Sequence, residues 1–442
     1  MKKFSTLFIL TVIISSSAMS QWLIQSSGFD TPSRGITDIH ALNDSVVWAA
    51  AYDGEDPNAA NQEFTRTVNG GELWEADTIT GAEGTSIANI FALNADTAYV
   101  AMYIIDSLEN QGIYVTRDGG ETWEEQTTAS YNNSSSFLNV VHFFDDSTGF
   151  AQGDPVGGDF ELYTTTDGGE TWIQVPGDVI PDPLANEWGV VGYYSAVNDT
   201  LWFGTNLGRV YRTPDRGQTW EAFSTGLGTY VDVRFANSMY GLAQDKGQNT
   251  TGTFAESFDG GETWTEIEAT GPTLSNDFTF VPGTDSTWIA TGSNTTVGAN
   301  AAGLAYSYDG GHTWEFFLDT EGFQFLATDF VDPQTGWVGG FNQDSITGGM
   351  YKFNGDLTTS VKELPAVENL VIYPNPAEDI ITVKGDSKIN NIQVVNLAGQ
   401  IVLEITVNAK MSLVNTSSLK SGLYLMNIIS DIGTDTRKVS VR

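Results

Sequence analysis

The chain has 442 residues, enough for two or three domains, and its 19 Lys and Arg residues against 56 Asp and Glu residues give a net charge of −37. Nearly all of the excess negative charge lies in residues 21–360, because residues 361–442 carry eight basic and eight acidic side chains. Such an acidic surface repels phosphate backbones and anionic lipids, so we expect no nucleic-acid partner. The absence of Cys excludes disulfides, thiolate metal sites and Cys nucleophiles.

The N-terminus has the pattern of a secretory signal peptide. Lys2 and Lys3 precede an apolar run from Leu7 to Ile14, and Ala18 and Ser20 supply the small residues of a cleavage site. The apolar run is too short to span a bilayer. We therefore predict a signal peptide over residues 1–20, a mature chain that starts near Gln21, and no transmembrane segment in that mature chain.

Residues 21–358 contain a motif that repeats about every 50 residues. Its clearest copy, Thr116–Trp123, reads Thr-Arg-Asp-Gly-Gly-Glu-Thr-Trp, and near-perfect copies end at Trp172, Trp220, Trp264 and Trp314. A weaker copy ends at Trp74, and the remnant Lys352–Gly355 is a seventh. A second series also has seven members, each an aromatic residue after an Asp/Asn-rich turn: Trp48, Tyr99, Phe150, Trp202, Tyr240, Trp288 and Trp337.

Each repeat contains four short alternating runs separated by Gly-rich turns, which is typical of four antiparallel strands. Seven such units in a ring make a seven-bladed β-propeller, an all-β fold in which closure hides the sheet edges. The seventh repeat lacks its Trp and its last strand. Because Trp22–Gln25 resembles the missing piece, we predict that this N-terminal strand closes the ring.

The repeated motif resembles the Asp box, or BNR repeat, of sialidases, sortilin-type receptors and photosystem assembly factors. Local physics is sufficient to explain it, since the Asp accepts backbone N–H groups, the Gly adopts positive φ and the Trp packs between blades. We therefore interpret these residues as structural: Asn69, Asp118, Asp167, Asp215, Asp259 and Asp309 as the box acids or amide, and Trp74, Trp123, Trp172, Trp220, Trp264 and Trp314 as the box tryptophans.

The end of the chain forms a separate module. Residues 359–369 read as a charged, Pro-containing linker, and residues 370–442 contain short strands between Gly and Asn turns, which predicts a small Ig-like β-sandwich. The Tyr-Pro-Asn-Pro segment at Tyr373, the Leu-x-x-Gly-Leu-Tyr stretch ending at Tyr424 and the terminal Lys438-Val439 pair resemble a type A sorting domain of the type IX secretion system. The resemblance implies the type IX secretion machinery as a partner, a host among the Bacteroidota, and a secreted or surface-attached protein.

One Trp belongs to neither repeat series. Trp188 ends a Pro-containing loop in which Asp182 and Glu187 also lie, and this trio predicts a site that stacks and hydrogen-bonds a ligand. Packing of Trp188 at the start of a strand is the alternative. Acidic loops that carry Asp53, Asp56, Asp154 and Asp159 are further candidates, either as ligand or Ca²⁺ sites, or as a solvated rim.

A third group of polar residues falls at one shared position of the innermost predicted strands. This group comprises His40, His142, Arg234 and Asp329, with Asp38, Asp232 and Asp277 two positions earlier. We interpret it as the lining of a polar channel rather than as a catalytic cluster. No metal ligand set and no catalytic residue can be named from the sequence.

These features predict an exported, monomeric binding or adhesion module for carbohydrate or an extracellular protein, and no cofactor other than Ca²⁺ is considered. The converging arginines and the Arg-Ile-Pro motif of sialidases are absent. The alternative is a polysaccharide-degrading glycoside hydrolase that uses a carboxylate pair on the face opposite the Asp boxes.

Overall fold

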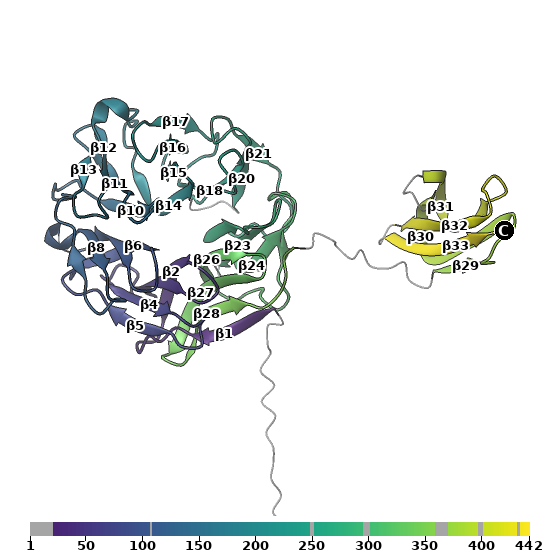
Figure 1. The fold of residues 1–442 in the computed structure, drawn as a ribbon, viewed down its shortest axis with the longest axis horizontal. Coiled ribbons are helices and arrows are strands. Elements are labelled where there is room, and N and C mark those ends of the chain that lie inside the picture. The colour runs from purple at the N-terminus through teal and green to yellow at the C-terminus, as the bar shows by residue number, and fades with distance from the viewer. Residues whose placement is uncertain are drawn as a thin grey trace, which may run out of the picture. The chain divides into compact units, whose positions relative to one another are not determined.

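The computed structural model describes residues 21–106, 108–247, 252–294, 301–358, 370–396, 401–430 and 434–442. The chain divides into two compact units, Met1–Thr358 and Thr359–Arg442 (Figure 1). The described residues are almost entirely β-strands and turns, together with two short 3₁₀ helices, η1 (Leu108–Asn110) and η2 (Gly177–Val179). The fold class is therefore all-β, as the sequence predicted.

Five sheets of the first unit are four-stranded antiparallel meanders in chain order. Their strands are β6 (Thr85–Ala92), β7 (Ala98–Ile104), β8 (Gly112–Thr116) and β9 (Glu124–Glu125); β10 (Leu138–Phe143), β11 (Gly149–Val156), β12 (Asp159–Thr165) and β13 (Ile173–Gln174); β14 (Gly189–Val197), β15 (Thr200–Thr205), β16 (Arg209–Thr213) and β17 (Glu221–Ser224); β18 (Val231–Phe235), β19 (Gly241–Asp245), β20 (Thr253–Ser257) and β21 (Thr265–Ile267); and β22 (Asp277–Phe280), β23 (Trp288–Ser293), β24 (Ala302–Ser307) and β25 (Glu315–Phe316).

The remaining strands of this unit form two further groups of four that share one bridge, Gly35 opposite Phe341. The first group is β2 (Arg34–Ala41), β3 (Val47–Asp53), β4 (Glu63–Thr67) and β5 (Glu75–Thr78), and the second is β26 (Phe325–Asp332), β27 (Thr335–Asp344), β28 (Thr347–Phe353) and β1 (Trp22–Ser26). In Figure 1, β2, β10, β14, β18 and β26 lie toward the middle of the unit, whereas β5, β17, β21 and β1 lie toward its rim.

Strand β1 joins the last group through the whole of its length. It runs antiparallel to β28, with Trp22 opposite Phe353 and Ser26 opposite Gly349. The Trp22 ring is 3% exposed and packs against Phe353 at a centroid distance of 5.1 Å and against Phe317 at 5.4 Å. The first and last strands of the described part of this unit are therefore held together by a strand ladder and an aromatic cluster.

The Asp-box turns show why the motif has its residue types. In Thr116–Trp123, Asp118 accepts the backbone N–H of Thr122 at 2.9 Å and the Thr122 hydroxyl at 2.6 Å. The Thr116 hydroxyl accepts the N–H of Gly120 at 2.8 Å, and Gly119 and Gly120 have φ of 79° and 94°. A side chain at either glycine would be strained in that conformation. The motif is thus a self-contained turn that needs no ligand.

The box tryptophans contact the neighbouring sheet. Three pairs join successive sheets at ring-centroid distances of 5.2–5.3 Å: Trp123 with Phe64, Trp220 with Phe150, and Trp314 with Phe254. The box turns lie on the same side as the turns between the first and second strands, since the Gly119 N–H donates to the Asp96 carbonyl at 2.9 Å. We call this side the box face and the opposite side, with the longer connections, the loop face.

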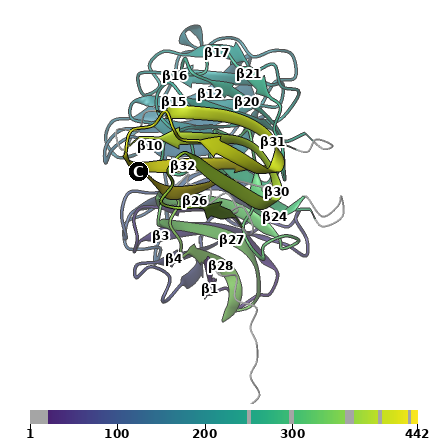
Figure 2. The ribbon, with the colours of Figure 1, turned by 90° about the vertical axis from the view of Figure 1, so that its right-hand side faces the viewer.

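The second unit has five strands: β29 (Val371–Tyr373), β30 (Ile380–Val395), β31 (Ile401–Asn415), β32 (Gly422–Ser430) and β33 (Thr434–Val441). The long strand β30 pairs with β29 and β31 through its first part and with β31 and β32 through its second part. Figure 2 shows the curvature of these strands. Their inner side chains, including Ile381, Val394 and Met426, form a separate core, so the unit is sandwich-like.

Candidate functional site

Trp188 lies on the loop face, directly before β14, and its side chain is 39% exposed. The backbone on either side of it is fixed, because the Trp188 N–H donates to Asn206 Oδ1 at 2.8 Å. Its ring borders a cavity of about 290 Å³, the Trp188 pocket, which is lined by Phe137, Asn139, Asp154, Trp188, Gly189, Val190 and Val191. Two of the predicted ligand-binding residues, Trp188 and Asp154, are therefore brought together.

Asp154 supplies the carboxylate of this pocket. Its Oδ1 accepts the Asn139 amide at 2.8 Å and the Gly189 N–H at 3.0 Å. Burial raises the pKa of Asp154 to about 6, although both hydrogen bonds oppose that shift. Both bonds fall on one oxygen, so Oδ2 accepts none from the described residues. The pocket thus combines an exposed aromatic face with a fixed hydrogen-bond acceptor.

Glu187, in contrast, is buried and paired within the protein, and it does not line the Trp188 pocket. Its side chain is 0% exposed and forms an ion pair with Arg209 at 2.7 Å. It also accepts the Thr205 hydroxyl at 2.8 Å and the Leu184 N–H at 2.8 Å. These partners occupy the carboxylate inside the protein, because a buried charge is tolerated only when it is paired and hydrogen-bonded.

The other predicted site residues do not converge on the Trp188 pocket. Asp182 is exposed and contributes its backbone carbonyl to Arg209 at 3.4 Å. Asp159 is half-buried and does not line the pocket. Asp53 pairs with Arg34 at 2.8 Å, and Asp56 is exposed in the turn that follows. Among the described residues, no group of three or more His, Asp or Glu side chains is arranged to hold a metal ion.

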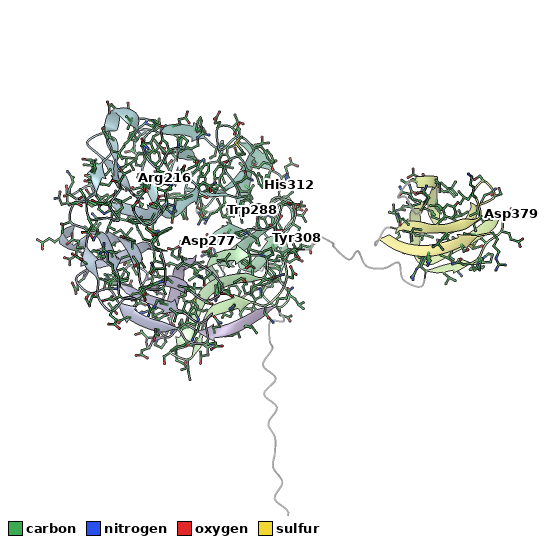
Figure 3. The ribbon with its side chains drawn as sticks, viewed as in Figure 1. Arg216, Asp277, Trp288, Tyr308, His312 and Asp379 are labelled. Carbon is green, nitrogen blue, oxygen red and sulfur yellow. The ribbon has the colours of Figure 1, made fainter. Side chains whose placement is uncertain are left out.

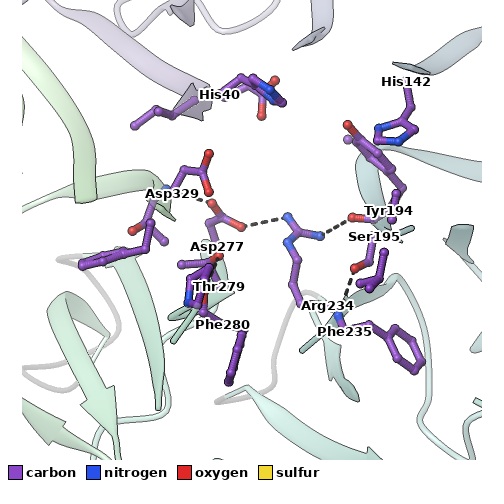
Figure 4. A pocket seen from close by; sticks show the side chains of 18 of the residues that line it. His40, His142, Tyr194, Ser195, Arg234, Phe235, Asp277, Thr279, Phe280 and Asp329 are labelled. Atoms are coloured by element: carbon purple, nitrogen blue, oxygen red, sulfur yellow. Dashed lines mark hydrogen bonds and ion pairs between the residues drawn. The ribbon is translucent and has the colours of Figure 1, made fainter. Parts of the chain in front are cut away.

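The middle of the unit contains two further cavities. The lower pocket, near the box face, has a volume of about 460 Å³ and is bordered by His40, His142, Tyr194, Arg234, Asp277 and Asp329 (Figure 4). The upper pocket, near the loop face, has about 190 Å³ and is bordered by Tyr52, Tyr103, Tyr193 and Lys246. Asp277 lies toward the middle of the unit and His312 toward its edge (Figure 3). The inner-strand residues predicted to line a polar channel do meet here.

Arg234 bridges the channel between the two pockets. It pairs with Asp232, donates to Asp277 Oδ1 at 3.0 Å and reaches the Tyr194 carbonyl at 3.0 Å (Figure 4). Lys246 pairs with the same Asp232 at 2.5 Å. Arg234 and Lys246 are therefore already paired with the buried Asp232 and the partly buried Asp277.

The channel carboxylates also tie neighbouring sheets together. Asp38 of β2 accepts the Ile90 N–H of β6 at 2.7 Å, and Asp329 of β26 accepts the Ala41 N–H of β2 at 2.8 Å. Asp277 of β22 accepts the Thr328 N–H of β26 at 2.9 Å. Hydrogen bonds from these three carboxylates thus join three pairs of neighbouring sheets around the channel.

Strand β14 departs from the other inner strands. It pairs with β15 at Gly189 opposite Thr205 and again at Tyr194 opposite Phe203, so four residues face the single residue Gly204. The corresponding breaks in β2, β6, β10 and β26 skip one residue each. Gly192, in the bulge, has φ of 70°, and a Cβ added there would lie 3.6 Å from the Ala88 carbonyl on β6. The bulge therefore crosses the channel and separates the upper pocket from the lower one.

Asp329→Asn is expected to stabilise the protein at pH 8 but hardly at pH 4. Burial raises the pKa of Asp329 to about 7, so the folded state keeps a proton that the unfolded state loses near pH 4. Stability contributed by this group is thus lost as pH rises toward 7. The Asn oxygen can still accept the Ala41 N–H. We expect the variant to gain about 2 kcal/mol at pH 8. Urea unfolding at both pH values measures this, and an equal effect at both would contradict it.

Comparison with known protein families gives one match in each of the two units. Residues 371–442 match the secretion system C-terminal sorting domain, and residues 102–238 match the photosynthesis system II assembly factor YCF48 family. YCF48 bound to a D1 peptide is 16% identical, with 76% of this chain and 97% of that chain covered at a TM-score of 0.50. YCF48 from Cyanidioschyzon merolae is 15% identical, with 76% and 99% covered at 0.51. No curated protein sequence matches the chain.

A catalytically inactive virginiamycin B lyase from Staphylococcus aureus, solved with quinupristin, is 13% identical, with 76% of this chain and 100% of that chain covered at a TM-score of 0.50. Identities this low support the propeller-like fold alone. The sorting domain has a functional meaning of its own: the protein is handled by the type IX secretion system and delivered to the cell surface or secreted. No helix in the described part of the chain is long and apolar enough to cross a membrane.

Sequence reasoning missed several residues of the loop face. Phe137, Tyr52 and Tyr103 belong to ordinary strand ends or loops, and Tyr193 reaches the upper pocket only because of the β14 bulge. One signal was present for Lys246, because it and Lys352 are the two lysines of residues 21–360. A lysine in so acidic a segment indicates a specific carboxylate partner.

Proposed function

We propose that the protein is an exported binding module, built on a seven-bladed β-propeller that β1 closes, with its ligand site at the Trp188 pocket. The ring is supported by the seven groups of four strands and by the β1–β28 ladder. The ligand is a carbohydrate or an extracellular protein, because export through the sorting domain brings the protein into contact with molecules of these kinds. The observation that carries the site is the cavity shared by the exposed Trp188 and the partly buried Asp154.

Trp188→Ala is expected to weaken ligand binding by about 1–3 kcal/mol, as loss of an interface aromatic does, with little change in melting temperature. The matched control is Trp172→Ala, since Trp172 is 4% exposed and belongs to the core. That control should lose about 3–5 kcal/mol of stability. Binding of the purified protein to a panel of polysaccharides and surface proteins measures the first effect. If Trp188→Ala unfolds as readily as the control, Trp188 is a packing residue and the site is wrong.

A glycoside hydrolase is the second candidate, and the lower pocket favours it, although this pocket lies near the box face and not on the face opposite the Asp boxes, where the sequence predicted the carboxylate pair. Burial raises the pKa of Asp38 to about 6 and that of Asp329 to about 7, values suited to a general acid near neutral pH. Both carboxylates also accept an inter-sheet N–H, which accounts for them without catalysis. Release of reducing ends on the same polysaccharide panel, lost in Asp329→Asn, would favour the hydrolase over the binding module.

A further inference from the structure

Five partly exposed aromatic side chains line two pockets on the loop face. Trp188 and Phe137 border the Trp188 pocket, and Tyr103, Tyr193 and Tyr52 border the upper pocket. The two pockets share Val191, and the Phe137 ring lies 5.1 Å from the Tyr103 ring. These five residues, which we call the aromatic track, come from β3, β7, the connection before β10, and the start of β14. The two pockets are therefore neighbours on the loop face.

The β14 bulge makes this surface. Because Val190 to Tyr193 leave the ladder with β15, Val191 stands between the two pockets and Tyr193 enters the upper one. There the Tyr193 ring lies 4.7 Å from the Lys246 ammonium, which also donates to the Asn276 carbonyl at 2.7 Å. A regular strand would have kept these residues in the sheet, whereas here Val191 packs against a core cluster and Tyr193 borders the upper pocket.

The charges near the track argue against an anionic ligand. Lys246 and Arg234 are neutralised by Asp232 and Asp277, and Asp154 adds a carboxylate at the other end. The chain as a whole carries a net charge of −37, which repels polyanions at long range. Aromatic faces combined with fixed carboxylate and amide groups suit the C–H faces and hydroxyls of a neutral sugar.

We infer that the loop face binds a neutral polysaccharide chain, with one sugar stacked on Trp188 and further sugars along the aromatic track into the upper pocket. This inference rests on the proposed function and narrows it, since it names the ligand class and assigns a second subsite. A chain ligand is favoured over a single sugar because the two cavities, of about 290 and 190 Å³, are adjacent, with Val191 lining both.

The experiment compares neutral oligosaccharides of two and six sugars, with polygalacturonate as the anionic probe, by calorimetry on the purified protein. The six-sugar ligand should bind about tenfold more tightly, a factor that corresponds to about 1.4 kcal/mol. Tyr193→Leu and Tyr52→Leu should each remove most of that gain and leave two-sugar binding unchanged, whereas Trp188→Ala should weaken both ligands. Two tyrosine variants are used so that poor folding of one leaves the other informative.

Phe258→Leu is the matched control, because Phe258 is an aromatic residue that is 66% exposed in a box turn on the opposite face. It should change neither affinity. Equal affinity for the two lengths, tighter binding of polygalacturonate, or six-sugar binding that is intact in both tyrosine variants would overturn the inference. If a protein ligand binds through Trp188 and no saccharide does, the proposed function stands and this inference fails. If Trp188→Ala changes no interaction, the proposed function itself fails.

Discussion

Deletion of residues 21–28 is expected to destabilise the first unit by about 5 kcal/mol or more, although it removes only a short terminal segment. The loss combines the burial of Trp22, for which Trp-to-Ala changes typically cost about 3–5 kcal/mol, with the ladder that covers β28. The exposed β28 edge would also become a template for pairing with other chains. Thermal unfolding followed by circular dichroism, together with a sedimentation measurement of aggregation, tests both effects.

The same strand offers a control that leaves the backbone in place. Leu23 is 50% exposed on β1, so Leu23→Ser should change stability by no more than about 0.5 kcal/mol. Trp22→Ala should fall between this control and the deletion. An unchanged melting temperature after deletion would mean that β1 is dispensable, and the proposal of a ring closed by the N-terminal strand would have to be abandoned.

Glu187→Ala is expected to cost about 3–5 kcal/mol, since removal of one partner of a buried ion pair leaves the other charge uncompensated. Arg209 is 16% exposed and would lose its carboxylate, and the Leu184 N–H and Thr205 hydroxyl would lose their acceptor. Guanidinium unfolding of the variant measures the loss. The nearby Asp182→Ala, at an exposed position, should have little effect.

A second substitution separates two effects of Glu187→Ala: the loss of the contacts that Glu187 makes and the unpaired charge left on Arg209. In the double variant Glu187→Ala with Arg209→Met, the unpaired cation is gone, so part of the lost stability should return. The result that would contradict this interpretation is a Glu187→Ala protein of normal stability with impaired ligand binding. Glu187 would then belong to the ligand site after all, beside Trp188.

The sequence was most informative where local physics decides the structure. The Asp-box residues hydrogen-bond within eight positions of each other, so residue type and spacing alone predict their turn, as Asp118 and Thr122 illustrate. That Asp38, Asp277 and Asp329 line the channel was also predictable, because side chains alternate between the two faces along a strand. Their bonds to the next sheet were not, since those depend on partners in other repeats.

The candidate site depended on long-range features that one sequence does not contain. Glu187 and Trp188 are neighbours in a polar loop, yet one points inward to Arg209 and the other borders a cavity. The direction of each side chain depends on a segment that is distant in the sequence. Arg209 on β16 pairs with Glu187, and Phe137, in the connection before β10, lines the pocket beside Trp188. The β14 bulge could not be predicted either. The residues Val190–Tyr193 do not themselves show that β15 offers only Gly204 opposite them.

The pairing of β1 with β28 also sets an order of events during synthesis. Strand β1 leaves the ribosome first among the strands, whereas β28 is the last strand of its unit, so β1 waits without its partner until the unit is complete. Contacts of such large sequence separation form slowly, because the chain entropy is lost before the contact can compensate for it. During that interval the apolar Trp22 lacks the strand and the aromatic rings that cover it in the folded unit. A copy that ends before β28 therefore lacks the β1–β28 ladder, and we expect it to be more open to proteolysis than the whole unit.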